Sequence, residues 1–133
     1  MRTRSFLIFC AVGLVPIALG YGAKPSVTLK VLFDINVDTT NLAHIMRAVM
    51  GLYLGMVVLW FWGAFSRSMA GPALAACAVF MLGLATGRIL SFILDGLPHW
   101  LLIVYAALEI LLGLIATILY RGHNSKEAPA TQC

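Results

Sequence analysis

The chain has 133 residues, of which 62% are hydrophobic and only 11% are charged. Its mean hydropathy of +0.97 lies far from the balance of a soluble globular domain, so the composition indicates a membrane protein. The net charge of +4 is spread over several short segments and forms no basic run or stripe, so we expect no nucleic-acid partner.

Four windows are long and apolar enough to cross the hydrocarbon layer of a bilayer, which is about 30 Å thick. The sequence therefore predicts an all-α integral membrane protein, an antiparallel bundle of four transmembrane helices, with the lipid bilayer as its first partner. The bundle fills one domain over residues 1–121, and the polar tail at 122–133 is expected to be disordered. The predicted spans cover residues 6–21, 43–65, 72–94 and 99–120.

The first window has two interpretations. It follows the basic start Arg2-Thr3-Arg4, is short, and contains Pro16. A signal peptide has the same pattern of a basic start and a short apolar run. We expect a retained span, because proline is tolerated in membrane helices whose neighbours satisfy the freed carbonyl; a cleaved signal peptide is the alternative.

Lysines and arginines in the connecting segments predict the orientation. If the N-terminus is cytoplasmic, five basic residues fall on the inner side and two on the outer side, as the positive-inside rule requires. Both termini are therefore expected in the cytoplasm. The inner residues are Arg2, Arg4, Arg67, Arg121 and Lys126, and the outer residues are Lys24 and Lys30.

The connection at 22–42 is the longest in the chain. Apolar residues alternate with mostly polar ones over 27–38, and a period of two is typical of an extended segment with one apolar face. We expect this segment to lie on the outer membrane surface or to cap the bundle. An irregular loop is the alternative, since an isolated strand lacks pairing partners.

Three charged residues, Arg47, Arg88 and Glu109, lie inside the predicted spans. A charge at the bilayer centre costs about 2.5–3.5 kcal/mol even on insertion scales, so each requires a partner, a water-filled cavity or a function. At 1.5 Å per residue all three lie in the outer half of the bundle. They are therefore expected to meet, and Arg88 is expected to pair with Glu109 across neighbouring helices.

Two classes of function fit these charges. In a purely structural lock, paired charges fix the helix packing of a non-enzymatic or accessory protein. In a ligand site, the arginines bind an anionic lipid or a small anion. A small proton-coupled carrier using Glu109 is a further alternative, and homo- or hetero-oligomers remain open. No catalytic residue, metal or cofactor is predicted. The candidate polar cluster comprises Arg47, Arg88, Glu109, Asp95, His44, Asn41 and Ser91.

Glycines recur on the same helix faces as these charges. Small residues four apart let membrane helices approach closely, so we predict that the second and third spans pack through two glycine seams. The seams consist of Gly51, Gly55, Gly83 and Gly87.

Two polar elements resemble a known family. Residues 38–55 place Asn41 before Arg47 and Gly51, and residues 87–98 join Gly87-Arg88 to Asp95-Gly96. Together with the single glutamate of the last span, they are similar to small four-span bacterial membrane proteins grouped as domain of unknown function 4345. The resemblance covers the last three spans and the preceding loop. It implies an inner-membrane helical bundle with the same polar positions and implies no activity.

Overall fold

The protein is described by a computed structural model covering residues 2–127. This part of the chain is helical and has no strand. Four of its helices are long and apolar enough to cross a membrane, which confirms an all-helical protein with four potential spans. The helices are α1 (Arg2–Gly22), α2 (Pro25–Phe33), α3 (Thr40–Phe65), α4 (Arg67–Leu94) and α5 (Trp100–Glu127).

The four long helices all extend beyond their predicted limits, and the extensions of α4 and α5 are the longest. α4 already begins at Arg67, so Ser66 alone separates it from α3, and Pro72 lies inside the helix rather than at its start. α5 continues to Glu127, so the predicted disorder is wrong for residues 122–127. The remainder of the predicted tail, 128–133, lies outside the described residues.

The predicted extended segment is a short helix, α2, followed by an irregular stretch at 34–38. Pro25 suits the first turn because it has no N–H to leave unpaired. It shares one buried face with Leu29 and Phe33 at intervals of four. Asp34 ends the helix in the left-handed conformation, with φ of 57°. The period of two was misleading because the same residues also fit a helical period that satisfies the backbone internally.

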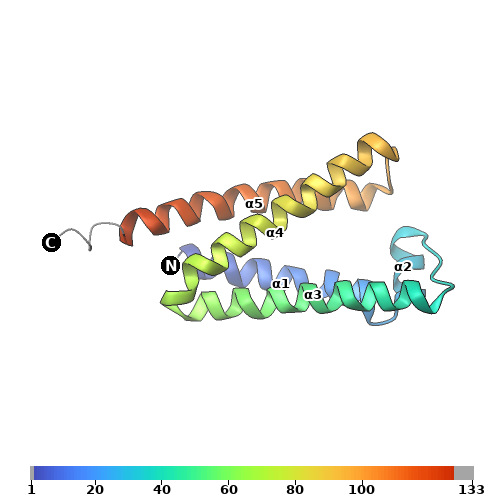
Figure 1. Cartoon of the computed structure of the whole chain (residues 1–133), viewed down its shortest axis with the longest axis horizontal. Helices are drawn as coiled ribbons and strands as arrows, with labels where there is room; N and C mark the ends of the chain where they lie inside the picture. The colour runs from blue at the N-terminus through green and yellow to red at the C-terminus, as the bar shows by residue number, and fades with distance from the viewer. Residues whose placement is uncertain (1, 128–133) are drawn as a thin grey trace.

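The long helices form two pairs. α1 packs along α3, and α4 packs along α5. Figure 1 shows the pairs converging at the connection between α3 and α4 and diverging towards the opposite end, where α2 lies between them. We call these the turn end and the α2 end. The start of α1 and the C-terminal part of α5 both lie towards the turn end in Figure 1.

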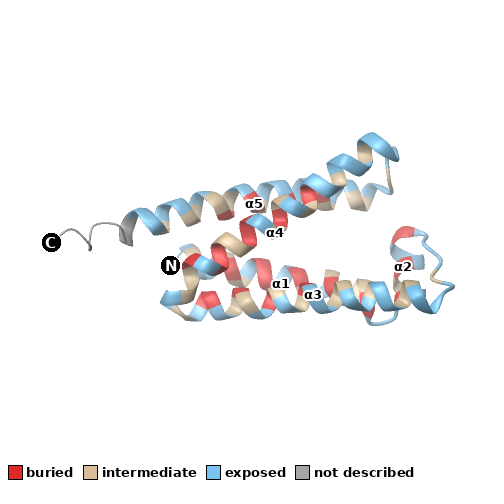
Figure 2. Ribbon diagram, viewed as in Figure 1, coloured by how far each residue is buried: buried red, intermediate tan, exposed pale blue. Residues whose placement is uncertain are grey.

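The buried core follows the contact between α1, α3 and α4, whereas much of α5 and the far half of α4 are exposed (Figure 2). Trp60 is its largest fully buried side chain. Gly63 supports the close approach of α3 to α4, because an added Cβ there would collide with the Cβ of Ala73 and lie 3.0 Å from the Met69 carbonyl oxygen. Small residues therefore set the helix spacing at the turn end.

The predicted glycine seams do not pack helices together. A Cβ added at Gly51, Gly55, Gly83 or Gly87 would meet no atom within 4 Å. The predicted role of these four glycines is therefore wrong, because their faces of α3 and α4 point away from the neighbouring helices. Closely packed glycines occur instead at Gly63, at Gly113, where an added Cβ would lie 2.7 Å from Leu82, and at Gly22 of α1, where it would lie 2.5 Å from the Met50 Cβ of α3.

Candidate functional site

Arg88 of α4 and Glu109 of α5 form the predicted ion pair. The Arg88 Nε donates to both carboxylate oxygens of Glu109, at 3.0 Å to Oε1 and 2.8 Å to Oε2. Within the described chain, Glu109 is the one buried charged residue, with 8% of its surface exposed. The pair joins two helices and cancels two charges at a depth where either charge alone would be costly.

Tyrosines surround this pair on several sides. The Tyr105 ring lies one helical turn before Glu109, and its centroid is 5.9 Å from the Arg88 Cζ, within cation–π range. Tyr21 and Tyr53, from α1 and α3, contact each other edge to face at 5.7 Å. The Tyr21 side chain also interacts with Arg88, so the ion pair lies in a polar and aromatic neighbourhood built by all four long helices.

α2 closes this neighbourhood through Phe33. Its ring stacks on Tyr21 at 6.1 Å and meets the edge of Tyr105 at 6.4 Å and of His99 at 6.5 Å. One buried side chain thus links α1 to α5 across the α2 end. The short helix is positioned by this aromatic contact and by the Thr28 hydroxyl, whose Oγ1 donates to the Gly20 carbonyl oxygen.

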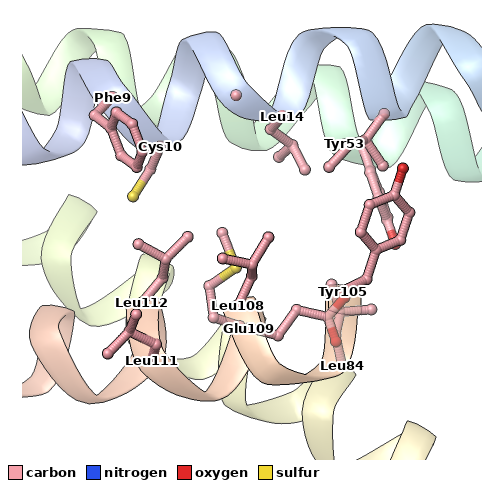
Figure 3. A pocket seen from close by; sticks show the side chains of 13 residues that line it. Phe9, Cys10, Leu14, Tyr53, Leu84, Tyr105, Leu108, Glu109, Leu111 and Leu112 are labelled. Carbon is pink, nitrogen blue, oxygen red and sulfur yellow. The ribbon is translucent and has the colours of Figure 1, made fainter. Parts of the chain in front are cut away.

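A cavity of about 250 Å³ adjoins the ion pair, between α1 and α5. Figure 3 shows Cys10 and Leu14 above it and the α5 side chains, including Leu108 and Glu109, below it. The wall of the cavity is almost entirely apolar. Among the described residues that line it, Glu109 is the only charged one. The remaining lining residues are Phe9, Gly13, Ile17, Tyr53, Met81, Leu84, Tyr105, Leu111 and Leu112.

Arg47 does not join the other two charges of the predicted spans. It is exposed and lines a separate surface hollow with Lys24 and Asp38 at the α2 end. The expectation that Arg47, Arg88 and Glu109 meet is therefore wrong for Arg47. Because Arg47 lies in the second turn of α3, its long side chain is at the surface and can extend to the polar head-group layer of a bilayer.

The other predicted polar residues also lie apart from the pair. The Ser91 hydroxyl donates to Asp95 Oδ2 at 2.7 Å, one turn further along α4, so these two form a local contact at the helix end. His44 and Asn41 are exposed in the first turns of α3. Of the seven predicted cluster members, the structure joins only Arg88 with Glu109 and Ser91 with Asp95.

Sequence reasoning missed the aromatic residues of the site. Tyr105 stands four residues before Glu109, a spacing that places both on one helix face, so this signal was available. Tyr21, Phe33 and Tyr53 gave no such signal, because their contacts depend on where α2 folds back. Within residues 2–127, no group of three or more histidine, cysteine, aspartate or glutamate side chains could hold a metal ion.

Comparison with known proteins gives one match. No curated protein and no solved structure matches the chain. The family described as domain of unknown function (DUF4345) matches residues 2–120, which include all of α1 to α4 and most of α5. The match extends over the first helix as well as the three spans that carry the polar elements. The chain therefore belongs to the DUF4345 family.

Proposed function

We propose that this protein is a non-enzymatic, multi-pass protein of the bacterial inner membrane that binds a lipophilic molecule between α1 and α5. The observation that supports this proposal is the apolar cavity of about 250 Å³ with Glu109 in its wall. Binding sites in helical bundles occur between helices and combine an apolar lining with a few polar groups. The cavity has this composition.

The cavity size suits a small apolar molecule or part of a larger one. It exceeds the roughly 150 Å³ cavity that binds benzene in an engineered protein core and is slightly smaller than typical drug-sized pockets of about 300–1,000 Å³. α1 packs mainly on α3 and α5 mainly on α4. A molecule in the surrounding lipid would therefore enter the cavity between α1 and α5. We therefore expect a hydrocarbon chain to occupy it.

The Arg88–Glu109 pair acts as the polar wall of this cavity and as a lock between α4 and α5. Both oxygens of Glu109 already accept from Arg88, so the carboxylate needs no ligand to be satisfied. This arrangement supports binding of a neutral apolar group more than binding of a second anion. It also supports binding more than proton-coupled transport, which needs a carboxylate free to exchange its proton.

Orientation is part of the proposal. The basic residues of the connections favour cytoplasmic termini and an outer location for α2. A cysteine placed at Asn36, which is exposed between α2 and α3, should react with a membrane-impermeant maleimide in intact cells. A cysteine at Ser68 should react only after the cells are opened. The reverse pattern would contradict the orientation and leave the cavity proposal standing.

A cavity-filling substitution tests the proposed binding. Gly13 lines the cavity, and an added Cβ there would meet nothing within 4 Å, so Gly13→Leu should fill the space without disturbing the helices. Dodecanol added to the detergent-solubilised protein should raise the melting temperature saturably in the natural chain, by mass action. Gly13→Leu should remove this shift.

Gly83→Leu is the matched control. It adds the same side chain to an equally open position of a membrane helix, but Gly83 does not line the cavity. The dodecanol shift should persist in this variant. A shift retained in Gly13→Leu, or lost equally in both variants, would contradict binding in the cavity.

A further inference from the structure

A second hollow lies on the surface of the α2 end, away from the cavity. It has a volume of about 380 Å³ and is formed where the chain enters α2 and where it enters α3. Two cationic side chains, Lys24 and Arg47, reach it from these two elements. Its other lining residues are Ala23, Pro25, Ser26, Val27, Val37, Asp38, Thr39, Thr40 and Ala43.

The two cations have no internal partner. In the part of the chain that the structure describes, neither the Lys24 nor the Arg47 side chain forms an ion pair or a hydrogen bond. Asp38 lines the same hollow and also forms no ion pair with any residue of 2–127. The three formal charges leave a net positive charge in the hollow, in contrast to the neutral Arg88–Glu109 pair. The hollow is therefore complementary to an anion.

The depth of Arg47 matches the head-group layer of a bilayer. α3 has 26 residues, which corresponds to about 39 Å at 1.5 Å per residue and exceeds the hydrocarbon layer by about 9 Å. Arg47 lies seven positions after the start of α3, so its guanidinium can reach the lipid phosphates. The first N–H groups of α3, next to Thr40, add a positive helix terminus at the same level.

A bare strip of α3 continues inward from Arg47. Gly51 and Gly55 follow on the same face at intervals of four, both are exposed, and an added Cβ at either would meet nothing within 4 Å. The strip therefore does not serve helix packing in this chain. The missing side chains leave the α3 backbone accessible on the face that carries Arg47, on the side of Arg47 away from the start of the helix.

We propose that an anionic phospholipid binds at this site. Its phosphate lies between Lys24 and Arg47, and one acyl chain runs along the Gly51–Gly55 strip. The phosphodiester accepts charge-assisted hydrogen bonds from both cations, and the glycines let the chain contact the helix backbone. The net positive charge of the hollow favours an anionic lipid over a zwitterionic one. This site is independent of the cavity between α1 and α5.

Melting of the purified full-length chain in detergent tests the proposal. Phosphatidylglycerol titrated into the micelles should raise the melting temperature saturably, whereas phosphatidylcholine should give little shift. The double variant Lys24→Gln, Arg47→Gln should need at least tenfold more phosphatidylglycerol for the same shift. Gly51→Leu, which obstructs the strip and keeps both cations, should also weaken the response.

Lys30→Gln is the matched control for charge. Lys30 is exposed on α2 at the same end of the molecule but does not line the hollow. Phosphatidylglycerol should therefore raise the melting temperature of this variant as much as that of the natural chain. An equal loss of the phosphatidylglycerol response in Lys30→Gln would overturn a specific site. An equal rise in melting temperature with phosphatidylcholine would do the same. A shift of the same size from soluble glycerol phosphate would overturn the role of the acyl chain. Absence of any shift would overturn the proposal as a whole.

Discussion

The two ends of the bundle hold their helices together in different ways. At the turn end, Gly63 and Ala73 bring α3 against α4, and Leu7 of α1 packs against the same point. At the α2 end, the helix pairs diverge (Figure 1), and the contacts are the Arg88–Glu109 pair and the aromatic contacts of Phe33. The turn end relies on close apolar packing, whereas the α2 end adds polar and aromatic contacts to the close approach of α1 and α3 at Gly22.

This difference reflects the solvent around the bundle. Lipid tails are as apolar as leucine, so burial of apolar side chains drives helix association only weakly in a membrane. Close packing of small residues supplies dispersion contacts at the turn end. Towards the α2 end, α1 and α3 still approach closely at Gly22, but α1 and α5 leave a cavity between them. An ion pair there fixes the geometry of α4 and α5 without filling the space that a ligand would use.

The largest expected effect comes from breaking the ion pair. Glu109→Gln and Arg88→Gln should each lower the free energy of unfolding by about 3–5 kcal/mol, because each leaves a buried or half-buried charge without its ion-pair partner. The double variant should recover much of this loss, since no charge remains unpaired. Denaturant unfolding of the purified protein in detergent measures all three.

Asp95→Asn is the control for this cycle. Asp95 is an exposed carboxylate at the end of α4 that bonds Ser91 of its own helix, so its loss should change stability little. Losses that simply add in the double variant would show that Arg88 and Glu109 do not stabilise each other.

The second expected effect is release of α2. Phe33→Ala should cost about 3 kcal/mol, the lower range for truncating a buried phenylalanine, because it removes the ring that contacts α1 and α5. Hydrogen exchange should become faster in the amides of α2 while α1 and α3 at the turn end remain protected. Val31→Ala, on the exposed face of the same helix, should leave the exchange of α2 unchanged. Equal effects of the two substitutions would mean that Phe33 does not anchor α2.

The third test compares two glycines in neighbouring helices. Gly63→Ala should lower stability by about 1–3 kcal/mol, since its methyl group overpacks the contact with Ala73. Gly83→Ala should raise stability by up to about 1 kcal/mol, because alanine favours the helix and the position is open. Opposite signs in thermal unfolding would confirm that α3 and α4 pack tightly at Gly63 and that Gly83 faces open space. A loss in both variants would indicate a second tight contact at Gly83.

The four long helices were predictable because apolar length alone identifies a membrane span. The pairing of Arg88 with Glu109 was predictable too, since both positions lie at similar depth on helices joined by a short turn. The location of Arg47 away from this pair was not predictable. Depth along the helix does not determine which face of α3 meets its neighbours, and Arg47 shares its face with Gly51 and Gly55, which the structure leaves open.

The prediction of an extended segment in place of α2 failed for a different reason. Its sequence fits two periods at once, and only the position of Phe33 between α1 and α5 distinguishes them. That position depends on tertiary contacts far along the chain, because Tyr21 and Tyr105 are 84 residues apart in the sequence. Local pattern therefore could not determine the structure of the connection, nor could it reveal the cavity, whose walls come from four helices.

The smallest expected effect distinguishes the starts of α3 and α4, one at each end of the molecule. Thr39 caps α3, with its Oγ1 accepting from the Leu42 N–H at 3.2 Å. Ser66 precedes α4 without a capping hydrogen bond, and its hydroxyl contacts Ser68 at 3.0 Å. Thr39→Ala should therefore lower stability by about 1 kcal/mol, the usual cost of a lost cap.

Ser66→Ala should change stability much less, because no helix N–H loses its acceptor and α4 is already held by Gly63 and Ala73 at its start. Thermal unfolding of both variants, with hydrogen exchange of the first turns of α3 and α4, measures the difference. The α2 end depends on a few directional contacts, so the loss of one hydrogen bond there should open the first turn of α3. A larger loss from Ser66→Ala than from Thr39→Ala would contradict this division between the ends, since it would make the turn end depend on a polar contact as well.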